Sequence, residues 1–202
     1  MSDSKTKPKV AVTTAGLRGT TWNAERLPKD VKISIHPLPT SDGAAVTGYL
    51  FSRGGEKTVV CAMHPRELTV TQYLVPEVLQ GGCAVWVQGS RSPNNDLRLE
   101  HETAIIDLAA GQCFLREQGF ERRVLVGLSG GAPLASYYNQ QANLAPADRV
   151  ARSPAGKPTD LAEVDMPVPD AFVLISPHLG QGKLLETCID PAVVDENDPL
   201  QT

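Results

Sequence analysis

The sequence predicts an α/β fold in which a mostly parallel sheet is covered on both faces and begins with an antiparallel N-terminal hairpin. Two early segments alternate apolar and polar residues, as strands with one solvated face do. Later segments are short continuous apolar runs, typical of strands covered on both faces. Helical segments separate these runs, and this alternation of strand and helix predicts a parallel sheet.

The first strands are expected over residues 31–36 and 45–51, which flank the turn sequence Thr40-Ser41-Asp42-Gly43. Their alternation predicts an antiparallel pair. Residues 58–63 then run apolar without alternation, which predicts a buried strand. A helix is expected over residues 67–80, but Pro76 predicts a kink or a late start.

The second half of the chain continues the same pattern. Residues 83–87 predict a buried strand, and the polar loop 88–96 leads to a long helix over residues 97–118 that ends at Gly119. A strand over 122–128, a helix over 132–141, a proline-rich insert at 144–169 and a buried strand over 171–176 complete the order. We expect residues 1–30 to form a partly flexible arm, 31–189 the core, and 190–202 an acidic tail or a junction to a missing C-terminal part.

Composition narrows the class of protein. The chain has 202 residues, of which 41% are hydrophobic and 21% are charged, as in one soluble globular domain. A net charge of −4 offers no basic face for nucleic acid. Residues 1–9 lack the apolar segment of a signal peptide, and no run approaches membrane-spanning length, so a cytoplasmic location is expected.

Neither a metal nor an organic cofactor is expected. The four cysteines, Cys61, Cys83, Cys113 and Cys188, form no CxxC pair, and no histidine lies at zinc-finger spacing. The sequence also lacks the GxGxxG dinucleotide fingerprint. We therefore expect buried free thiols.

The central motif is Gly-Leu-Ser-Gly-Gly at residues 127–131, between an expected strand and an expected helix. A GxSxG sequence in this context predicts a nucleophile elbow, in which a sharp turn exposes the hydroxyl of Ser129. Small residues at Gly127 and Gly131 permit such a turn. The alternative is an ordinary turn in which Ser129 caps the helix.

Over residues 31 to about 189, this order of elements resembles the α/β-hydrolase family. The resemblance implies that Ser129 is the nucleophile and that the amide of Gly130 is one donor to the oxyanion. The second donor comes from the loop after the strand that ends at His64, where many members carry His-Gly. Here Pro65 fills the glycine position and has no N–H, so Arg66 becomes the candidate.

Four residues are expected to line the substrate site: His64, Leu128, Pro177 and His178. His178 follows a strand at the carboxyl edge of the sheet, where ligands bind in open α/β sheets, and the alternatives for it are pocket lining, a structural role or the base for Ser129. His64 either packs at its strand terminus or acts directly. Trp86 and Leu179 are expected near the site edge. Solvated or structural roles are expected for His36 and His101, and Asp165 and Asp195 are expected to be solvated loop charges.

In the family, the acid and the histidine follow the serine on loops after further strands, and no such strands follow residue 176. We favour a serine hydrolase acting on a carboxylic ester, with thioesters or amides possible, completed by a second polypeptide that supplies two strands, the acid and the histidine. That polypeptide would also cover the apolar edge of strand 171–176. The alternatives are a non-catalytic binding module and a self-sufficient esterase with a Ser129–His178 dyad. The insert 144–169 is either a flap over a pocket for a medium-sized apolar ester or a surface for docking.

Overall fold

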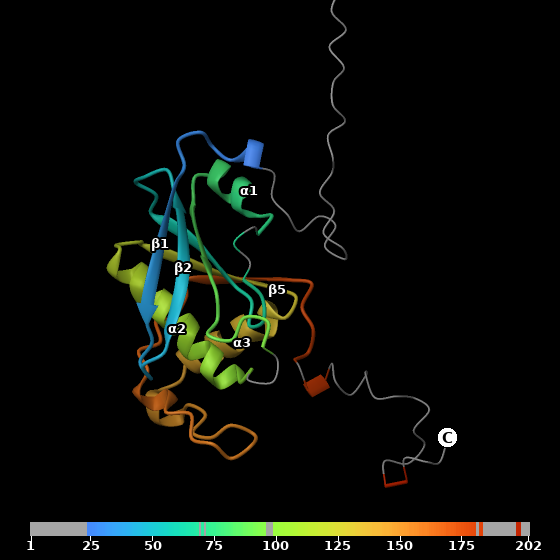
Figure 1. Ribbon diagram of the computed structural model, residues 1–202. Coiled ribbons are helices and arrows are strands. Elements are labelled where there is room, and N and C mark those ends of the chain that lie inside the picture. Colours follow the sequence, from blue (N-terminus) through green and yellow to red (C-terminus); the bar gives the residue numbers. More distant parts are fainter. Residues whose placement is uncertain are drawn as a thin grey trace, which may run out of the picture.

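The computed structural model in Figure 1 describes residues 24–68, 70, 72–95, 99–180, 182–183 and 197–198. In this part of the chain, six strands form one sheet in the order β1-β2-β4-β3-β5-β6. The strands are β1 (Lys32–Pro39), β2 (Ala45–Ser52), β3 (Thr58–Met63), β4 (Ala84–Gln88), β5 (Arg122–Leu128) and β6 (Ala171–Ile175).

The directions of the strands confirm the predicted fold class. Strand β2 pairs antiparallel with both β1 and β4, whereas β4, β3, β5 and β6 run parallel to one another. The carboxyl ends of β3, β5 and β6 therefore lie side by side at one edge of the sheet. This edge is where ligands bind in open α/β sheets.

Helices cover both faces of the sheet (Figure 1). They are α1 (Val75–Gln80), α2 (His101–Glu117) and α3 (Gly131–Ala142), with 3-10 turns η1 (Ala24–Arg26), η3 (Pro146–Asp148) and η4 (Leu161–Glu163). Among the described residues, no helix combines the length and apolar character that a membrane span needs.

Two clusters of buried side chains follow from the alternation along β4. Val85 and Val87 face α1 and pack with Phe51, Val75 and Leu79. The larger cluster lies on the opposite face, where Trp86 and residues of β3 and β5 meet α2 and α3. The predicted double coverage of the sheet is thus observed over its middle strands.

Helix α1 has the late start that was one of the two outcomes predicted from Pro76, and α2 begins later than expected. Helix α1 starts at Val75, with Pro76 in its first turn, where the missing N–H costs no helical hydrogen bond. Proline therefore marks the start of this helix and does not kink it. Helix α2 starts at His101 and not at residue 97, and residues 96–98 lie outside the described part.

Strand β6 is exposed, so the prediction that residues 171–176 are buried is wrong. The side chains of Phe172, Val173 and Leu174 are 44%, 45% and 38% exposed. Strand β6 pairs with β5 on one side, and no described strand pairs with its other side. Its apolar composition resembles that of an internal strand, but its place at the edge of the sheet leaves it open.

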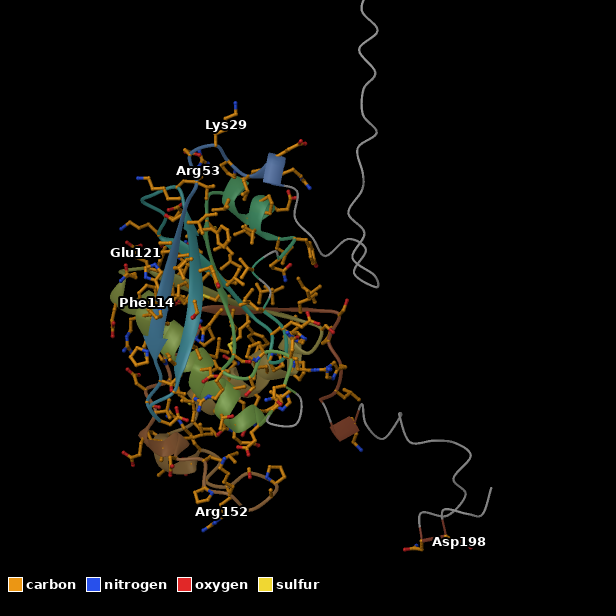
Figure 2. All side chains as sticks on the ribbon, viewed as in Figure 1. Lys29, Arg53, Phe114, Glu121, Arg152 and Asp198 are labelled. Atoms are coloured by element: carbon orange, nitrogen blue, oxygen red, sulfur yellow. The ribbon has the colours of Figure 1, made fainter. Side chains whose placement is uncertain are left out.

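The insert 144–169 is irregular and packs onto α2 and α3, at the lower end of Figure 1. Leu161, Val164 and Met166 are buried in the larger cluster. The Arg149 guanidinium donates to the carbonyls of Leu161, at 3.0 Å, and Val164, at 2.6 Å. Figure 2 shows Arg152 at the tip of this insert, at the opposite end of the molecule from Lys29 and Arg53.

Ion pairs also attach the insert to α2 and its N-cap. Exposed Asp165 pairs with Arg116 at 2.6 Å, and Lys157 pairs with the N-cap residue Glu100 at 2.9 Å. Asp165 is therefore a surface charge with a partner. Asp195 lies outside the described residues, as do residues 1–23 of the expected arm and most of the expected tail.

The described cysteines are free thiols, but only Cys61 is fully buried. Burial raises the pKa of the Cys61 thiol to about 12. Cys83 and Cys113 are half-buried, so the expectation of buried thiols is wrong for both, and Cys188 lies outside the described residues.

Candidate active site

Ser129 occupies a strained turn between β5 and α3. Its φ is 51°, in the left-handed region, and its side chain is exposed. This conformation costs an L-residue roughly 1–2 kcal/mol, because its β-carbon crowds the following carbonyl oxygen. The N-cap of α3 is Gly130, and no side chain caps that helix, so the alternative of Ser129 as a helix cap is wrong.

Glycines make this turn possible because their missing side chains leave room for backbone. A β-carbon at Gly127 would lie 2.5 Å from both Ala132 Cα and the Gly131 oxygen. A β-carbon at Gly131 would lie 2.6 Å from the Met63 oxygen at the end of β3. The start of α3 therefore packs directly against β5 and the end of β3.

The backbone of the turn is held on both sides. The Ser129 N–H donates to the Ile175 oxygen of β6 at 3.0 Å, and the Ser129 oxygen accepts from the Ala132 N–H at 3.0 Å. The Gly130 N–H has no hydrogen-bond partner among the described residues. A backbone donor thus remains open beside the exposed hydroxyl, at the positive end of α3.

His64 lies at the end of β3, and its tautomer is defined by two backbone donors. The amides of Arg66 and Glu67 both donate to His64 Nδ1 at 3.2 Å. Because Nδ1 accepts, the proton of the neutral ring is on Nε2. Burial lowers the pKa of His64, and Arg66 and His178 lower it further against the opposing effect of Glu67.

The imidazole of His64 lies against Gly130. A β-carbon at Gly130 would lie 2.7 Å from His64 Nε2 and 3.2 Å from Cε1. Gly130 is therefore the third glycine of the motif at which a side chain would clash, here with the imidazole of His64. Arg66, the expected second oxyanion donor, directs its amide at the His64 ring.

The loop after β3 is fixed from the loop after β4. Ser90 Oγ donates to the Pro65 oxygen at 2.7 Å, and the Asn94 N–H donates to the Arg66 oxygen at 2.7 Å. The second loop is itself tied to α2, because the Arg91 N–H donates to Asp107 Oδ2 at 2.8 Å and Arg91 Nη2 lies 2.6 Å from Asp107 Oδ1.

His178 follows β6 and is half-buried. The Gly180 N–H donates to its Nδ1 at 3.2 Å, so the neutral ring carries its proton on Nε2. Ser129 Oγ has no hydrogen-bond partner among the described residues. The structure therefore places His178 near the site without joining it to Ser129. Leu128 is half-buried and Pro177 is exposed at the ends of their strands.

His101, the first residue of α2, was expected to lie outside the site. Burial lowers its pKa, and the charge of His178 lowers the pKa of both His101 and His64. His178 therefore lies close enough to each of the other two rings for their charges to interact. The expected start at residue 97 placed His101 inside the helix, whereas in the structure it is the first helical residue.

Trp86, expected near the site edge, lies in the core instead. It is 1% exposed, and its ring lies 5.0 Å from that of Phe114. Figure 2 shows Phe114 beside β1, where its ring lies 4.6 Å from that of His36. His36 thus packs structurally, as expected. Leu179 is 91% exposed.

No family model and no curated protein matches the chain. Among solved structures, it is similar to an esterase from Pyrococcus furiosus, with 19% identity over 56% of this chain and 46% of the esterase and a TM-score of 0.46. A post-proline cleaving enzyme from Rickettsia typhi matches at 13% identity, 56% and 20% coverage and a TM-score of 0.48. Brefeldin A esterase, a bacterial homologue of human hormone sensitive lipase, matches at 20% identity, 59% and 38% coverage and a TM-score of 0.47. The aligned part of this chain spans less than half the length of each.

Proposed function

We propose that the protein is a serine hydrolase of the α/β-hydrolase type that cleaves carboxylic esters through an acyl-enzyme on Ser129. The supporting observation is the Ser129 turn, where a non-glycine residue has a φ of 51° and an exposed hydroxyl at the carboxyl edge of the sheet. Strain of this kind in a non-glycine residue is concentrated at functional sites. The open Gly130 amide beside it is suited to a developing oxyanion.

The reaction has two halves. Ser129 Oγ attacks the ester carbon, the carbonyl oxygen becomes an oxyanion beside the Gly130 N–H, and a base takes the serine proton. The base then protonates the leaving oxygen as the ester C–O bond breaks, which leaves the acyl group on Ser129. Water attacks this acyl group with the same base, and the acid is released. A thioester or an amide would follow the same steps with a thiol or an amine as the leaving group.

The base is the missing part of this machinery. His64 and His178 both accept a backbone N–H at Nδ1 and carry the neutral proton on Nε2, so neither ring presents a free lone pair at Nε2 to the serine. We therefore assign the base and its acid to polypeptide outside the described residues, on the second chain expected from the sequence. The exposed apolar strand β6 supports this assignment, because further strands would cover its open edge.

The test uses protein purified without denaturant from its natural source. Native and denaturing mass spectra should reveal a second polypeptide in fixed ratio that contains a histidine and an acid after apolar strands. A fluorophosphonate should modify Ser129 in this complex, and Ser129→Ala should abolish the modification.

The other outcomes separate the alternatives. An unreactive Ser129 in the intact sample would contradict the proposed hydrolase and favour a binding module. A reactive serine in a lone chain of 21.6 kDa would contradict the second polypeptide. It would then favour a dyad, which His178→Ala would inactivate.

A further inference from the structure

We propose that the side chain of His64 is the second oxyanion donor, and that it acts through Nε2–H opposite the amide of Gly130. This inference rests on the proposed hydrolase function. It replaces the backbone donor expected at Arg66 with an imidazole.

The position of the ring is the first argument. His64 Nε2 lies 2.7 Å from the point that a β-carbon of Gly130 would occupy. The ring nitrogen therefore lies against Gly130, the residue that follows Ser129 and whose amide is the first proposed donor. Because Gly130 has no side chain, the imidazole can approach the backbone of the turn this closely.

The tautomer is the second argument. A donor at Nε2 needs the ring proton there, and the amides of Arg66 and Glu67, both 3.2 Å from Nδ1, hold it there. The same contacts turn the Arg66 N–H toward the ring, and Pro65 has no N–H to offer. The loop after β3 therefore directs its donors at the imidazole, which presents one N–H to the site.

The third argument is that the ring stays neutral and fixed. Burial, Arg66 and His178 lower the pKa of His64, while Glu67 raises it, and the net shift is downward. A neutral imidazole can polarise a substrate carbonyl, as in triosephosphate isomerase. The bonds from Ser90 Oγ to Pro65 and from the Asn94 amide to Arg66 hold the loop, so the donor needs no reorganisation during the reaction.

The test compares His64→Leu with His64→Gln in the complex purified from its native host. Leucine fills the space without a donor, whereas the glutamine amide can donate at a similar reach. We expect His64→Leu to lower kcat about a hundredfold to a thousandfold with little change in KM. The kcat of His64→Gln should be at least about tenfold higher than that of His64→Leu. His36→Leu, on β1, serves as the matched control and should keep wild-type kcat.

A second readout does not depend on turnover. In protein labelled with ¹⁵N-histidine, NMR near neutral pH should show His64 protonated on Nε2 and unprotonated on Nδ1. The opposite tautomer would overturn the inference. Circular dichroism of each variant verifies that it is folded.

Failure of the inference and failure of the proposed function give different results. If a fluorophosphonate leaves wild-type Ser129 unmodified, the hydrolase proposal fails. If wild-type Ser129 is modified and His64→Leu keeps kcat within about threefold, the hydrolase stands and His64 is not a donor. If folded His64→Leu and His64→Gln lose kcat equally, His64 fills space in the site and donates no hydrogen bond.

Discussion

At the scale of single residues, two serines share an unusual backbone conformation at the ends of adjacent strands. Ser129 after β5 has a φ of 51°, and Ser176 after β6 has a φ of 49°. The other described non-glycine residues with positive φ are Asn94 and Asp160, and these two residue types tolerate this region. The serines therefore carry backbone strain that their side chains do not relieve.

Removing the β-carbon of Ser129 should release this strain. We expect Ser129→Gly to be more stable than Ser129→Ala by about 1 kcal/mol, because glycine adopts positive φ without a steric cost. Urea denaturation of both variants measures the difference. The matched pair is Ser136→Gly and Ser136→Ala in the middle of α3, where glycine should be the less stable by about 1 kcal/mol. If the glycine variant were the less stable one at both positions, the Ser129 turn would be unstrained.

Adding a β-carbon at Gly130 should disturb the site without unfolding the protein. The backbone of Gly130 is helical, with a φ of −61°, so alanine fits the conformation, but its methyl group would lie 2.7 Å from His64 Nε2. We expect Gly130→Ala to slow fluorophosphonate modification of Ser129 about a hundredfold, because small displacements of a site are costly. Gly182→Ala, where no atom lies within 4 Å, should react at the wild-type rate. Equal rates in the two variants would contradict the close approach of His64.

At the scale of elements, one arginine joins three segments around the site. Arg91, in the loop after β4, pairs with fully buried Asp107 on α2 and with Asp42 in the β1–β2 turn. The neighbouring residue Ser90 holds the loop that carries His64, through the Pro65 oxygen. Ion pairs and a hydrogen bond thus connect the loop after β3, the loop after β4, α2 and the β1–β2 turn.

Removing Asp107, the buried partner of Arg91, should destabilise the fold. Asp107→Ala leaves Arg91, whose side chain is only 21% exposed, without its main partner. We expect the free energy of unfolding to fall by about 3 kcal/mol, measured by urea denaturation. Glu117→Ala, at an exposed position on the same helix, should change it by less than about 0.5 kcal/mol. Similar small effects in both variants would show that the Asp107 pair adds nothing to stability.

Asp42 should make the free energy of unfolding depend on pH. The hydrogen bond from Arg91 lowers the pKa of Asp42 from 3.8 to about 2. A lowered pKa stabilises the fold above pH 4, and this contribution is lost as the pH falls toward 2. Because Asp42 is 35% exposed, we expect Asp42→Asn to cost no more than about 1 kcal/mol near pH 6 and less than half of that at pH 2, where the carboxyl is half protonated. Denaturation curves at several pH values measure this, with Asp148→Asn as the surface control, and a cost that does not shrink with acid would refute it.

At the scale of the whole molecule, the two edges of the sheet differ. Strand β1 forms one edge and exposes Ile33 and Ile35. It pairs with β2, and α2 packs against it. Strand β6, at the other edge, exposes Phe172, Val173 and Leu174, which point alternately to opposite faces of the sheet. An edge that is apolar on both faces is the expected surface for further strands and helices.

A charge on β6 should therefore separate the proposed partner. We expect Val173→Lys to prevent co-purification of the second polypeptide and to abolish Ser129 modification with it. Ile35→Lys, on the opposite edge at a residue that is 63% exposed, should leave both unchanged. Mass spectrometry of the purified complexes and fluorophosphonate labelling measure the two effects. Retention of a reactive complex by Val173→Lys would refute docking at β6.

The order of strands and helices and the place of the Ser129 turn could be predicted from the sequence, because both depend on local apolar patterns and on glycine. The bounds of β3 and β5 agree with those expected. Three features became clear only from the fold: the exposure of β6, the position of Trp86 in the core and not at the site edge, and the contact of His64 with Gly130, 66 residues further along the chain. Such contacts depend on which segments the sheet brings together, and they cannot be predicted from the residues that are adjacent in sequence. For this reason, the local pattern located the serine, whereas only the fold placed an imidazole beside it.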